Sequence, residues 1–327
     1  MRNILIFRQS SLGDFIVGIP AITIIKKKFF NYKIHYLLYR HSEIGAVNPD
    51  TILNNNKLID KFIYINKKDK SFIGLIKLII NLRKYQFIKF FYLNETERIS
   101  KFRIISHLLF FSLCKIKKIS GFNLQYKPNY SEGNESLHIA RRVDSNIKRS
   151  DIRKFISNSY RINKHSQNLT MKEFQLNGNF KNFITISNGG KLPLVAYTKG
   201  VNATKDWGLK NWKILLKKII YHYPTLKIII VGSKREYEKA KKLEKIKSKN
   251  VINLCGKTNI KELIEIIGKS KFHISHDDGT MHVASMFSKK SIAIFANWDI
   301  EGRWFPENKN SNIFYPKNSI KEIKPNL

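Results

Sequence analysis

The stretch Ile4-Leu5-Ile6-Phe7, followed closely by Ser10-Ser11-Leu12-Gly13-Asp14, decides the fold of this chain. The apolar run predicts a buried strand, and the apolar segment from Phe15 to Phe29 predicts the helix that follows it. Open α/β sheets bind their ligands at such turns from strand to helix. Asp14 is the first acidic residue of the chain, and we therefore expect it to be a catalytic group.

A structural interpretation of the same turn is also open. Ser10 or Ser11 would cap the helix, and Asp14 would lie in its first turn, where the helix dipole favours a carboxylate.

Two further polar turns follow strand-like runs. Ser275-His276-Asp277-Asp278-Gly279-Thr280-Met281-His282 lies between a short apolar strand and a helix. Gly279 allows a ligand to approach the backbone, and the first N–H groups of the helix suit a phosphate. The third turn, Thr198 to Trp207, follows the strand-like Leu194–Tyr197 and offers hydroxyls and Lys205 to phosphate oxygens.

Strand-like and helix-like segments alternate along both halves of the chain, which predicts an α/β fold with doubly wound parallel sheets. We expect one Rossmann-like domain over residues 1–175 and a second over residues 190–327. Between Arg161 and Pro193 the pattern weakens into Asn, Lys, Ser and Gly, so we expect a linker there with at most a short strand at Phe183–Ile186.

The three turns, in this order and spacing, resemble glycosyltransferase family 9, the ADP-heptose:lipopolysaccharide heptosyltransferases. Val231-Gly232-Ser233-Lys234-Arg235-Glu236 and Asn253-Leu254-Cys255-Gly256-Lys257-Thr258 resemble two further motifs of that family. The resemblance implies the GT-B architecture, in which two Rossmann-like domains face each other across a cleft. It also implies an inverting, metal-independent transfer of a hexosyl or heptosyl group.

The resemblance assigns roles to particular residues. Asp14 would be the general base, and Ser10, Ser11 and Gly13 would lie on the acceptor side. The donor, expected to be ADP-heptose, is a substrate, and no cofactor or metal is expected. The residues implied in donor binding are Thr204, Lys205, Glu236, Asp277, Asp278, Gly279 and His282.

Other readings of these residues are open. Glu236 would equally suit the first turn of a helix, His282 would suit a packed interior, and Trp207 would suit packing of the following helix. Asp278 departs from the family, which has Ser or Thr there, and places a carboxylate beside the expected phosphate site. Ala296-Asn297-Trp298 also departs from the family's F-G-x-T pattern.

Composition narrows the class of protein. The 327 residues are 43% hydrophobic, which predicts a globular chain of about two domains. No apolar run reaches the roughly 18 residues of a membrane span, and no signal peptide is recognised, so we expect a cytoplasmic protein. Cys114 and Cys255 match no metal or redox spacing and are read as reduced core thiols.

The net charge is +36, and residues 1–118 hold 22 Lys and Arg against 7 Asp and Glu. Such a surface attracts nucleic acid, anionic membranes or acidic substrates. Peripheral contact with the inner face of the inner membrane fits the resemblance, whereas coding bias would explain the charge without any partner. The helix expected at Ile99–Ser112 fits either core packing or an amphipathic helix that faces a membrane.

We therefore expect an inverting glycosyltransferase that acts on a nucleotide-sugar and an anionic, lipid-linked saccharide such as a lipopolysaccharide core. Two alternatives remain at this point. One is a nucleotide-sugar epimerase on the same fold, and the other is a basic nucleic-acid-binding protein, although no nucleic-acid-binding motif is found.

Overall fold

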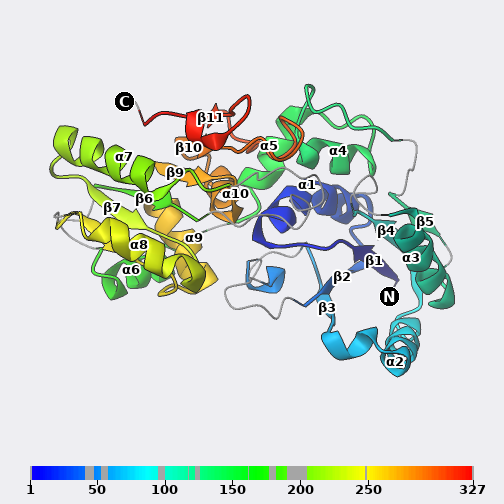
Figure 1. Ribbon diagram of the computed structural model, residues 1–327. Coiled ribbons are helices and arrows are strands. Elements are labelled where there is room, and N and C mark those ends of the chain that lie inside the picture. Colours follow the sequence, from blue (N-terminus) through cyan, green and yellow to red (C-terminus); the bar gives the residue numbers. More distant parts are fainter. Residues whose placement is uncertain are drawn as a thin grey trace. The chain divides into compact units, whose positions relative to one another are not determined.

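The computed structural model describes residues 2–40, 48–52, 58–94, 100–116, 118–121, 126–160, 162–176, 182–189, 205–246 and 249–325. These residues divide into two compact units (Figure 1). The first unit holds the described residues up to Phe155, apart from Tyr130–Asn134. The second unit holds Tyr130–Asn134 and the described residues from Ile156 onward.

A parallel sheet in the order β3-β2-β1-β4-β5 forms the centre of the first unit. Its strands are β1 (Asn3–Phe7), β2 (Lys33–Tyr39), β3 (Lys61–Ile65), β4 (Phe87–Tyr92) and β5 (Ile119–Ser120). Helices cover both faces of such a sheet, so its central strands are continuous apolar runs rather than alternating ones. Ile4, Leu5 and Ile6 of β1 are accordingly fully buried.

Five helices belong largely to the first unit: α1 (Leu12–Lys28), α2 (Phe72–Arg83), α3 (Lys101–Leu113), α4 (Glu135–Arg141) and α5 (Arg149–Ser157). The right-handed crossover rule places α1 on one face of the sheet and α2 and α3 on the other. The core agrees, because buried side chains of α2 and α3 pack with those of the strands in one cluster that contains no residue of α1.

The second unit is built on a parallel sheet in the order β11-β10-β9-β6-β7-β8. Its strands are β6 (Phe183–Ser187), β7 (Lys227–Ile230), β8 (Val251–Asn253), β9 (His273–His276), β10 (Ser291–Ile294) and β11 (Ser311–Phe314). Its helices are α6 (Lys164–Glu173), α7 (Leu209–His222), α8 (Tyr237–Glu244), α9 (Ile260–Lys269) and α10 (Gly279–Met286), with a 3-10 helix, η6 (Lys234–Glu236), before α8.

The division between the units falls near residue 155, earlier than the expected end of the first domain at residue 175. Helix α6 lies in the segment expected to be a linker, but it packs with α9 of the second unit. Ser166 and Thr170 donate hydrogen bonds of 2.8 and 2.5 Å to the two carboxylate oxygens of Glu265. Glu265 is buried, so these two hydroxyls satisfy a charge that would otherwise be costly to bury.

The short strand expected at Phe183–Ile186 is confirmed, but it is not part of a linker. It belongs to β6, which lies in the interior of the second sheet between β9 and β7. Its polar surroundings in the sequence suggested a linker, whereas its apolar side chains are those of a central strand. The strand expected at Leu194–Tyr197 lies outside the described residues.

Candidate functional site

Strand order decides which turns can form a site in each unit. In the first sheet, β1 lies between β2 and β4, so the direction of winding reverses at β1. In the second sheet it reverses at β6, which lies between β7 and β9. Ligands of open α/β sheets bind at the carboxyl ends of the strands at these switch points. The turn that contains Asp14 follows β1, and the turn that contains Asp277 and Asp278 follows β9, as this rule requires.

Asp14 lies in the first turn of α1, and its carboxylate is partly exposed. Its Oδ2 accepts hydrogen bonds from the backbone N–H of Ser11 at 3.0 Å and from the Ser11 hydroxyl at 2.6 Å. The capping interpretation of this turn is therefore confirmed. A capping carboxylate that stays partly exposed at a switch point can also accept a proton from a ligand, so the catalytic interpretation stays a prediction.

The other residues of this turn are less exposed. Ser10 is 2% exposed, and its hydroxyl lies 2.8 Å from the hydroxyl of Tyr36. Burial raises the pKa of Tyr36 to about 12, so this phenol stays protonated. Gly13 is buried in the first turn of α1. Of the three residues expected on the acceptor side, Ser11 alone is exposed.

Arg8, which sequence reasoning did not select, is a buried cation beside this turn. Its Nη1 donates to the carbonyl oxygen of Leu93 at 2.7 Å, and its Nε donates to the carbonyl oxygen of Asp14 at 3.4 Å. The Arg8 side chain packs against α1 at Gly18, where an added Cβ would lie 3.4 Å from it, an ordinary van der Waals contact. Arg8 therefore joins the turn after β1 to the turn after β4.

Asn94 strengthens the same connection. Its Oδ1 accepts from the backbone N–H of Gln9 at 2.7 Å, while Arg142 donates to the carbonyl oxygens of Leu93 and Asn94, both at 2.8 Å. These contacts join residues that are 48 to 85 positions apart in the chain. No local sequence signal could have identified them.

In the second unit, Lys205 and Asp277 form a buried ion pair. Lys205 Nζ lies 2.7 Å from Asp277 Oδ2, and their side chains are 12% and 6% exposed. Trp298 completes the group: its indole N–H donates to Asp277 Oδ2 at 2.9 Å, and its ring lies 4.0 Å from Lys205 Nζ. The sequence pattern marked Trp298 only as a departure from the family. In the structure its indole N–H orients the Asp277 carboxylate, which in turn pairs with Lys205.

Asp278 has a structural role, while its expected place beside the donor phosphate stays a prediction. It caps α10: its Oδ1 accepts from the backbone N–H and the hydroxyl of Thr280 at 2.8 and 2.6 Å, and its Oδ2 accepts from the Ser187 hydroxyl at 2.6 Å. Burial raises the pKa of Asp278 to about 6. This carboxylate therefore fixes the start of α10 against the end of β6.

Gly279 begins α10, and His282 lies in the first turn of that helix. His282 is only 5% exposed, which agrees with the packing interpretation of this residue. The first N–H groups of α10 are not all available to a ligand, because those of Thr280 and Met281 donate to Asp278.

His276 joins three segments of the second unit. Its Nε2 accepts from the backbone N–H of Trp207 at 3.3 Å, and its Nδ1 bonds the carbonyl oxygen of Gly189. These partners fix a neutral imidazole with the proton on Nδ1. Burial lowers the pKa of His276 to about 4, in agreement with that state. His273, on the same strand, faces Thr185 and Thr280 instead.

Glu236 closes the 3-10 helix η6 and is part of a capping box. Its Oε2 accepts from the backbone N–H and the hydroxyl of Ser233, at 2.7 and 2.5 Å. A Cβ at Gly189 would lie 2.7 Å from Glu236 Cγ, so the absence of a side chain at Gly189 brings Glu236 against the end of β6. The first-turn interpretation of Glu236 is confirmed, and its contact with a ribose stays a prediction.

Of the remaining residues in these turns, Trp207 packs in the core, and Asn188 and Asp206 are held by Lys239. Trp207 is 2% exposed and stacks edge-on against Trp212, so its packing interpretation is confirmed. Lys239 of α8 donates to the carbonyl oxygen of Asn188 at 2.7 Å and to Asp206 at 2.5 Å. Burial by itself would raise the pKa of Asp206, but the hydrogen bonds from Lys239 and from the N–H of Gly208 outweigh it. The pKa of Asp206 is therefore lowered. Thr204 lies outside the described residues.

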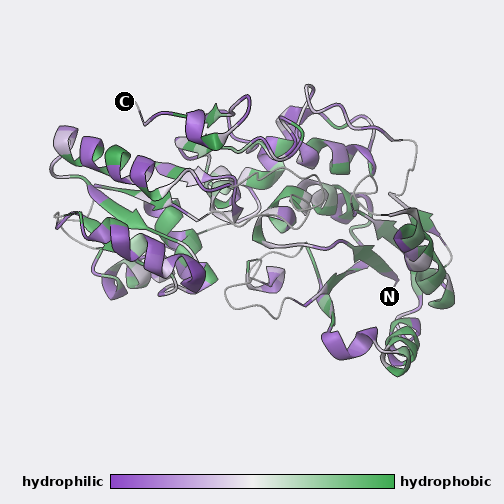
Figure 2. Cartoon of the chain, in the orientation of Figure 1, coloured by the Kyte–Doolittle hydropathy of each residue, from purple (hydrophilic) through white to green (hydrophobic). Residues whose placement is uncertain are grey.

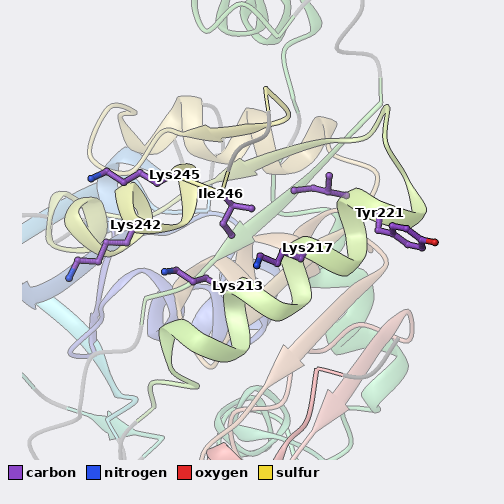
Figure 3. Close-up of a pocket in the computed structure, with 7 residues that line it drawn as sticks. Lys213, Lys217, Tyr221, Lys242, Lys245 and Ile246 are labelled. Atoms are coloured by element: carbon purple, nitrogen blue, oxygen red, sulfur yellow. The ribbon is translucent and has the colours of Figure 1, made fainter.

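A groove of about 700 Å³ lies elsewhere in the second unit, between α7 and α8 (Figure 3). Its lining contains none of the expected donor-binding residues. It consists of Lys213, Lys217, Ile220, Tyr221, Lys242, Lys245 and Ile246. Within the part of the chain that the structure describes, no group of three or more His, Cys, Asp or Glu residues is placed to hold a metal ion.

Two parallel-sheet α/β domains of this kind define the GT-B class of glycosyltransferase folds, and solved structures agree with this assignment. Escherichia coli ADP-heptose lipopolysaccharide heptosyltransferase II superposes with a TM-score of 0.69 at 14% identity, over 99% of this chain and 95% of that one. E. coli heptosyltransferase WaaC with ADP-2-deoxy-2-fluoro heptose gives a TM-score of 0.61 at 15% identity, over 99% and 96%.

Sequence comparison identifies the family. The model of glycosyltransferase family 9 (heptosyltransferase) matches residues 108–324. Lipopolysaccharide heptosyltransferase 1 of Campylobacter coli is 26% identical over 312 residues, which are 90% of this chain and 83% of the relative. The chain belongs to glycosyltransferase family 9, and it is an enzyme of the glycosyltransferase class. The resemblance, the fold and the transferase function expected from the sequence are therefore confirmed, in preference to the epimerase and nucleic-acid-binding alternatives.

Proposed function

We propose that this protein transfers a heptose from ADP-heptose to a hydroxyl of a lipopolysaccharide or lipooligosaccharide core acceptor. The observation that carries the proposal is the family match over residues 108–324. Two similar proteins support the particular substrates. The C. coli relative is a lipopolysaccharide heptosyltransferase, and the WaaC structure holds a fluorinated ADP-heptose.

The reaction would be a single inverting displacement. The acceptor oxygen forms a bond to the anomeric carbon as the bond from that carbon to the diphosphate oxygen breaks, and ADP leaves. Asp14 would take the proton of the acceptor hydroxyl, a contribution of roughly a hundred- to ten-thousand-fold. The Ser11 contacts would hold its carboxylate in one orientation.

On the donor side, Lys205 would offset the charge that grows on the leaving diphosphate. Asp277 and Trp298 keep its ammonium group in one place, so little reorganisation is needed during the reaction. Glu236, in the 3-10 helix η6 after β7, would bind the ribose. Cytoplasmic action at the inner face of the inner membrane completes the proposal, because a net charge of +36 suits an anionic, lipid-linked acceptor.

A donor screen tests this proposal. Thermal unfolding of the purified protein would be followed with ADP-heptose and with GDP-, UDP- and dTDP-sugars at equal concentration. Only a ligand that binds the folded state raises the melting temperature. We expect stabilisation by ADP-heptose and release of ADP once a core acceptor is added. Stabilisation by a different nucleotide-sugar alone would contradict the assigned donor.

A further inference from the structure

Helix α2 leaves most of its apolar side chains in water. Within the helix, Leu78 and Leu82 are buried and form a narrow stripe against the sheet. Phe72 and Ile73 are 79% and 66% exposed, and Ile76 and Ile80 are also exposed. A helix that served only the core would carry polar residues on this outer side.

Helix α3 has two apolar stripes. The inner one includes Ile104 and Phe111, which are buried. The outer one consists of residues three or four positions apart, a spacing that places them on one face of a helix. Its members are Phe102, Ile105, Leu109 and Leu113, and all are more than half exposed.

The two helices lie side by side on the same face of the first sheet. Arg83 in the last turn of α2 donates from Nε to the carbonyl oxygen of Leu113 at the end of α3, at 2.8 Å. Their inner residues also share one core cluster. Figure 2 shows apolar colouring along both helices, which Figure 1 identifies by label. We call their outer side the α2–α3 face, formed by Phe72, Ile73, Ile76, Ile80, Phe102, Ile105, Leu109 and Leu113.

Basic residues accompany this face. Residues 67–84 and 100–118 contain eleven Lys and Arg and one acidic residue, Asp69. Lys77 on α2 and Arg103 on α3 are exposed among the apolar side chains, and Lys67, Lys68 and Lys70 are exposed just before α2. An apolar surface with cationic neighbours is the pattern of elements that lie in the headgroup region of a bilayer.

We propose that the α2–α3 face docks this enzyme on an anionic lipid bilayer. Phe72 and Phe102 would enter the boundary between headgroups and acyl chains, while Lys77 and Arg103 would meet lipid phosphates. Near an anionic leaflet each basic residue strengthens the attraction to the surface. A second copy of the chain fits less well, because the cationic residues of both copies would face each other.

None of the helices in the described ranges combines the length and apolar character needed to cross a bilayer. The docking is therefore proposed as interfacial. It extends the proposed site of action, since a lipid-linked acceptor would be met at this surface, but vesicle binding can be measured without donor or acceptor. A failed sugar-transfer assay would thus leave this inference intact.

Cosedimentation with vesicles tests the proposal. The full chain would be mixed with vesicles of phosphatidylethanolamine and phosphatidylglycerol, or of phosphatidylcholine alone. We expect binding to the anionic vesicles and little to the neutral ones. The double variant F72S/F102S should bind about tenfold or more weakly, since two large apolar side chains would no longer be buried in the bilayer. The charge variant K77E/R103E should lose binding to anionic vesicles.

A matched control uses exposed apolar residues of the second unit. Tyr221 and Leu169 are 81% and 55% exposed and lie on α7 and α6. The double variant Y221S/L169S should bind vesicles like the unchanged protein, and all variants should unfold at the same temperature. Equal vesicle binding by F72S/F102S and the unchanged protein would overturn the proposal. So would concentration-dependent self-association that this variant abolishes, because a second copy would then be the occupant.

Discussion

The turn after β1 and the turn after β9 have the same plan, a buried strand followed by polar residues and a helix, yet they use their carboxylates differently. Asp14 lies inside the first turn of α1 and stays partly exposed while it bonds Ser11. Asp278 lies at the N-cap of α10, where it accepts from Thr280 in its own helix and from Ser187 at the end of β6. A shift of three positions relative to the helix start thus separates a carboxylate that bonds Ser11 within its own turn from one that ties its helix to a neighbouring strand.

The largest effect should come from Asp14→Asn. The amide can still accept a hydrogen bond from Ser11, but it cannot take a proton, so kcat for sugar transfer should fall by roughly a hundred- to ten-thousand-fold. Donor binding, followed by thermal stabilisation with the nucleotide-sugar, should persist. Unchanged kcat would remove Asp14 from the role of base.

Asp69 provides a matched control for that substitution. It occupies the same capping position in the 3-10 helix Lys67–Lys70 and accepts from the N–H and the side chain of Asn66 at 2.7 and 3.0 Å. Asp69→Asn should leave transfer unchanged. A similar loss of kcat in both variants would mean that capping, and not proton transfer, explains the effect.

Asp278→Ala should reduce stability rather than chemistry. It leaves the Ser187 hydroxyl and the first N–H groups of α10 without their acceptor, which costs about 2 to 4 kcal/mol of unfolding free energy. Denaturant unfolding measures this loss, and kcat at a temperature where the variant is folded should change little. A stable variant with a large loss of kcat would reverse the distinction drawn between the two turns.

His276 and Asp278, both in the turn after β9, should make the free energy of unfolding depend on pH in opposite directions. Burial lowers the pKa of His276 to about 4, so between pH 6.5 and 4 the native state binds fewer protons than the unfolded chain, and stability falls as pH falls. Burial raises the pKa of Asp278 to about 6, so its contribution to stability grows as pH falls from 6 toward 4.

The unchanged protein should lose about 2 kcal/mol of unfolding free energy between pH 7 and pH 5 because of His276, and His276→Gln should abolish this loss. Asp278→Asn should make the loss over the same range larger. Unfolding free energies at a series of pH values measure both slopes. Identical profiles for His276→Gln and the unchanged protein would show that this imidazole is not held neutral in the native state.

The smallest expected effect belongs to Trp298→Phe. The ring over Lys205 is retained, but the N–H bond to Asp277 is lost, which is worth about 1 kcal/mol. We expect a rise of roughly fivefold in KM for the donor with kcat little changed. Trp304→Phe is a suitable control, since its indole N–H donates to Asp299 instead.

Local sequence patterns predicted much of this architecture. Hydrophobic periodicity and turn residues reflect interactions between positions that are close in the chain. They located β1, α3 and the strand β6 within one to two residues. They wrongly assigned β6 to a linker, and they missed the attachment of α6, which depends on Glu265 some 100 residues away. Strand order and long-range contacts were not visible to them.

The same limit explains the site residues. Asp14, Lys205 and Asp277 stand in recognisable turns, so their positions at the switch points could be anticipated. Arg8, Asn94 and Trp298 were missed, because each acts through a partner brought near only when the sheet forms. The contact of Asp278 with Ser187 was also missed, since Ser187 lies on β6, 91 positions away in the chain.

The imidazole of His276 limits how this sequence can vary. One ring nitrogen bonds the carbonyl oxygen of Gly189 and the other accepts from the N–H of Trp207, so a single side chain satisfies polar backbone groups of two segments. A substitution at position 276 has to supply a donor and an acceptor at once in the same directions, which few side chains can do.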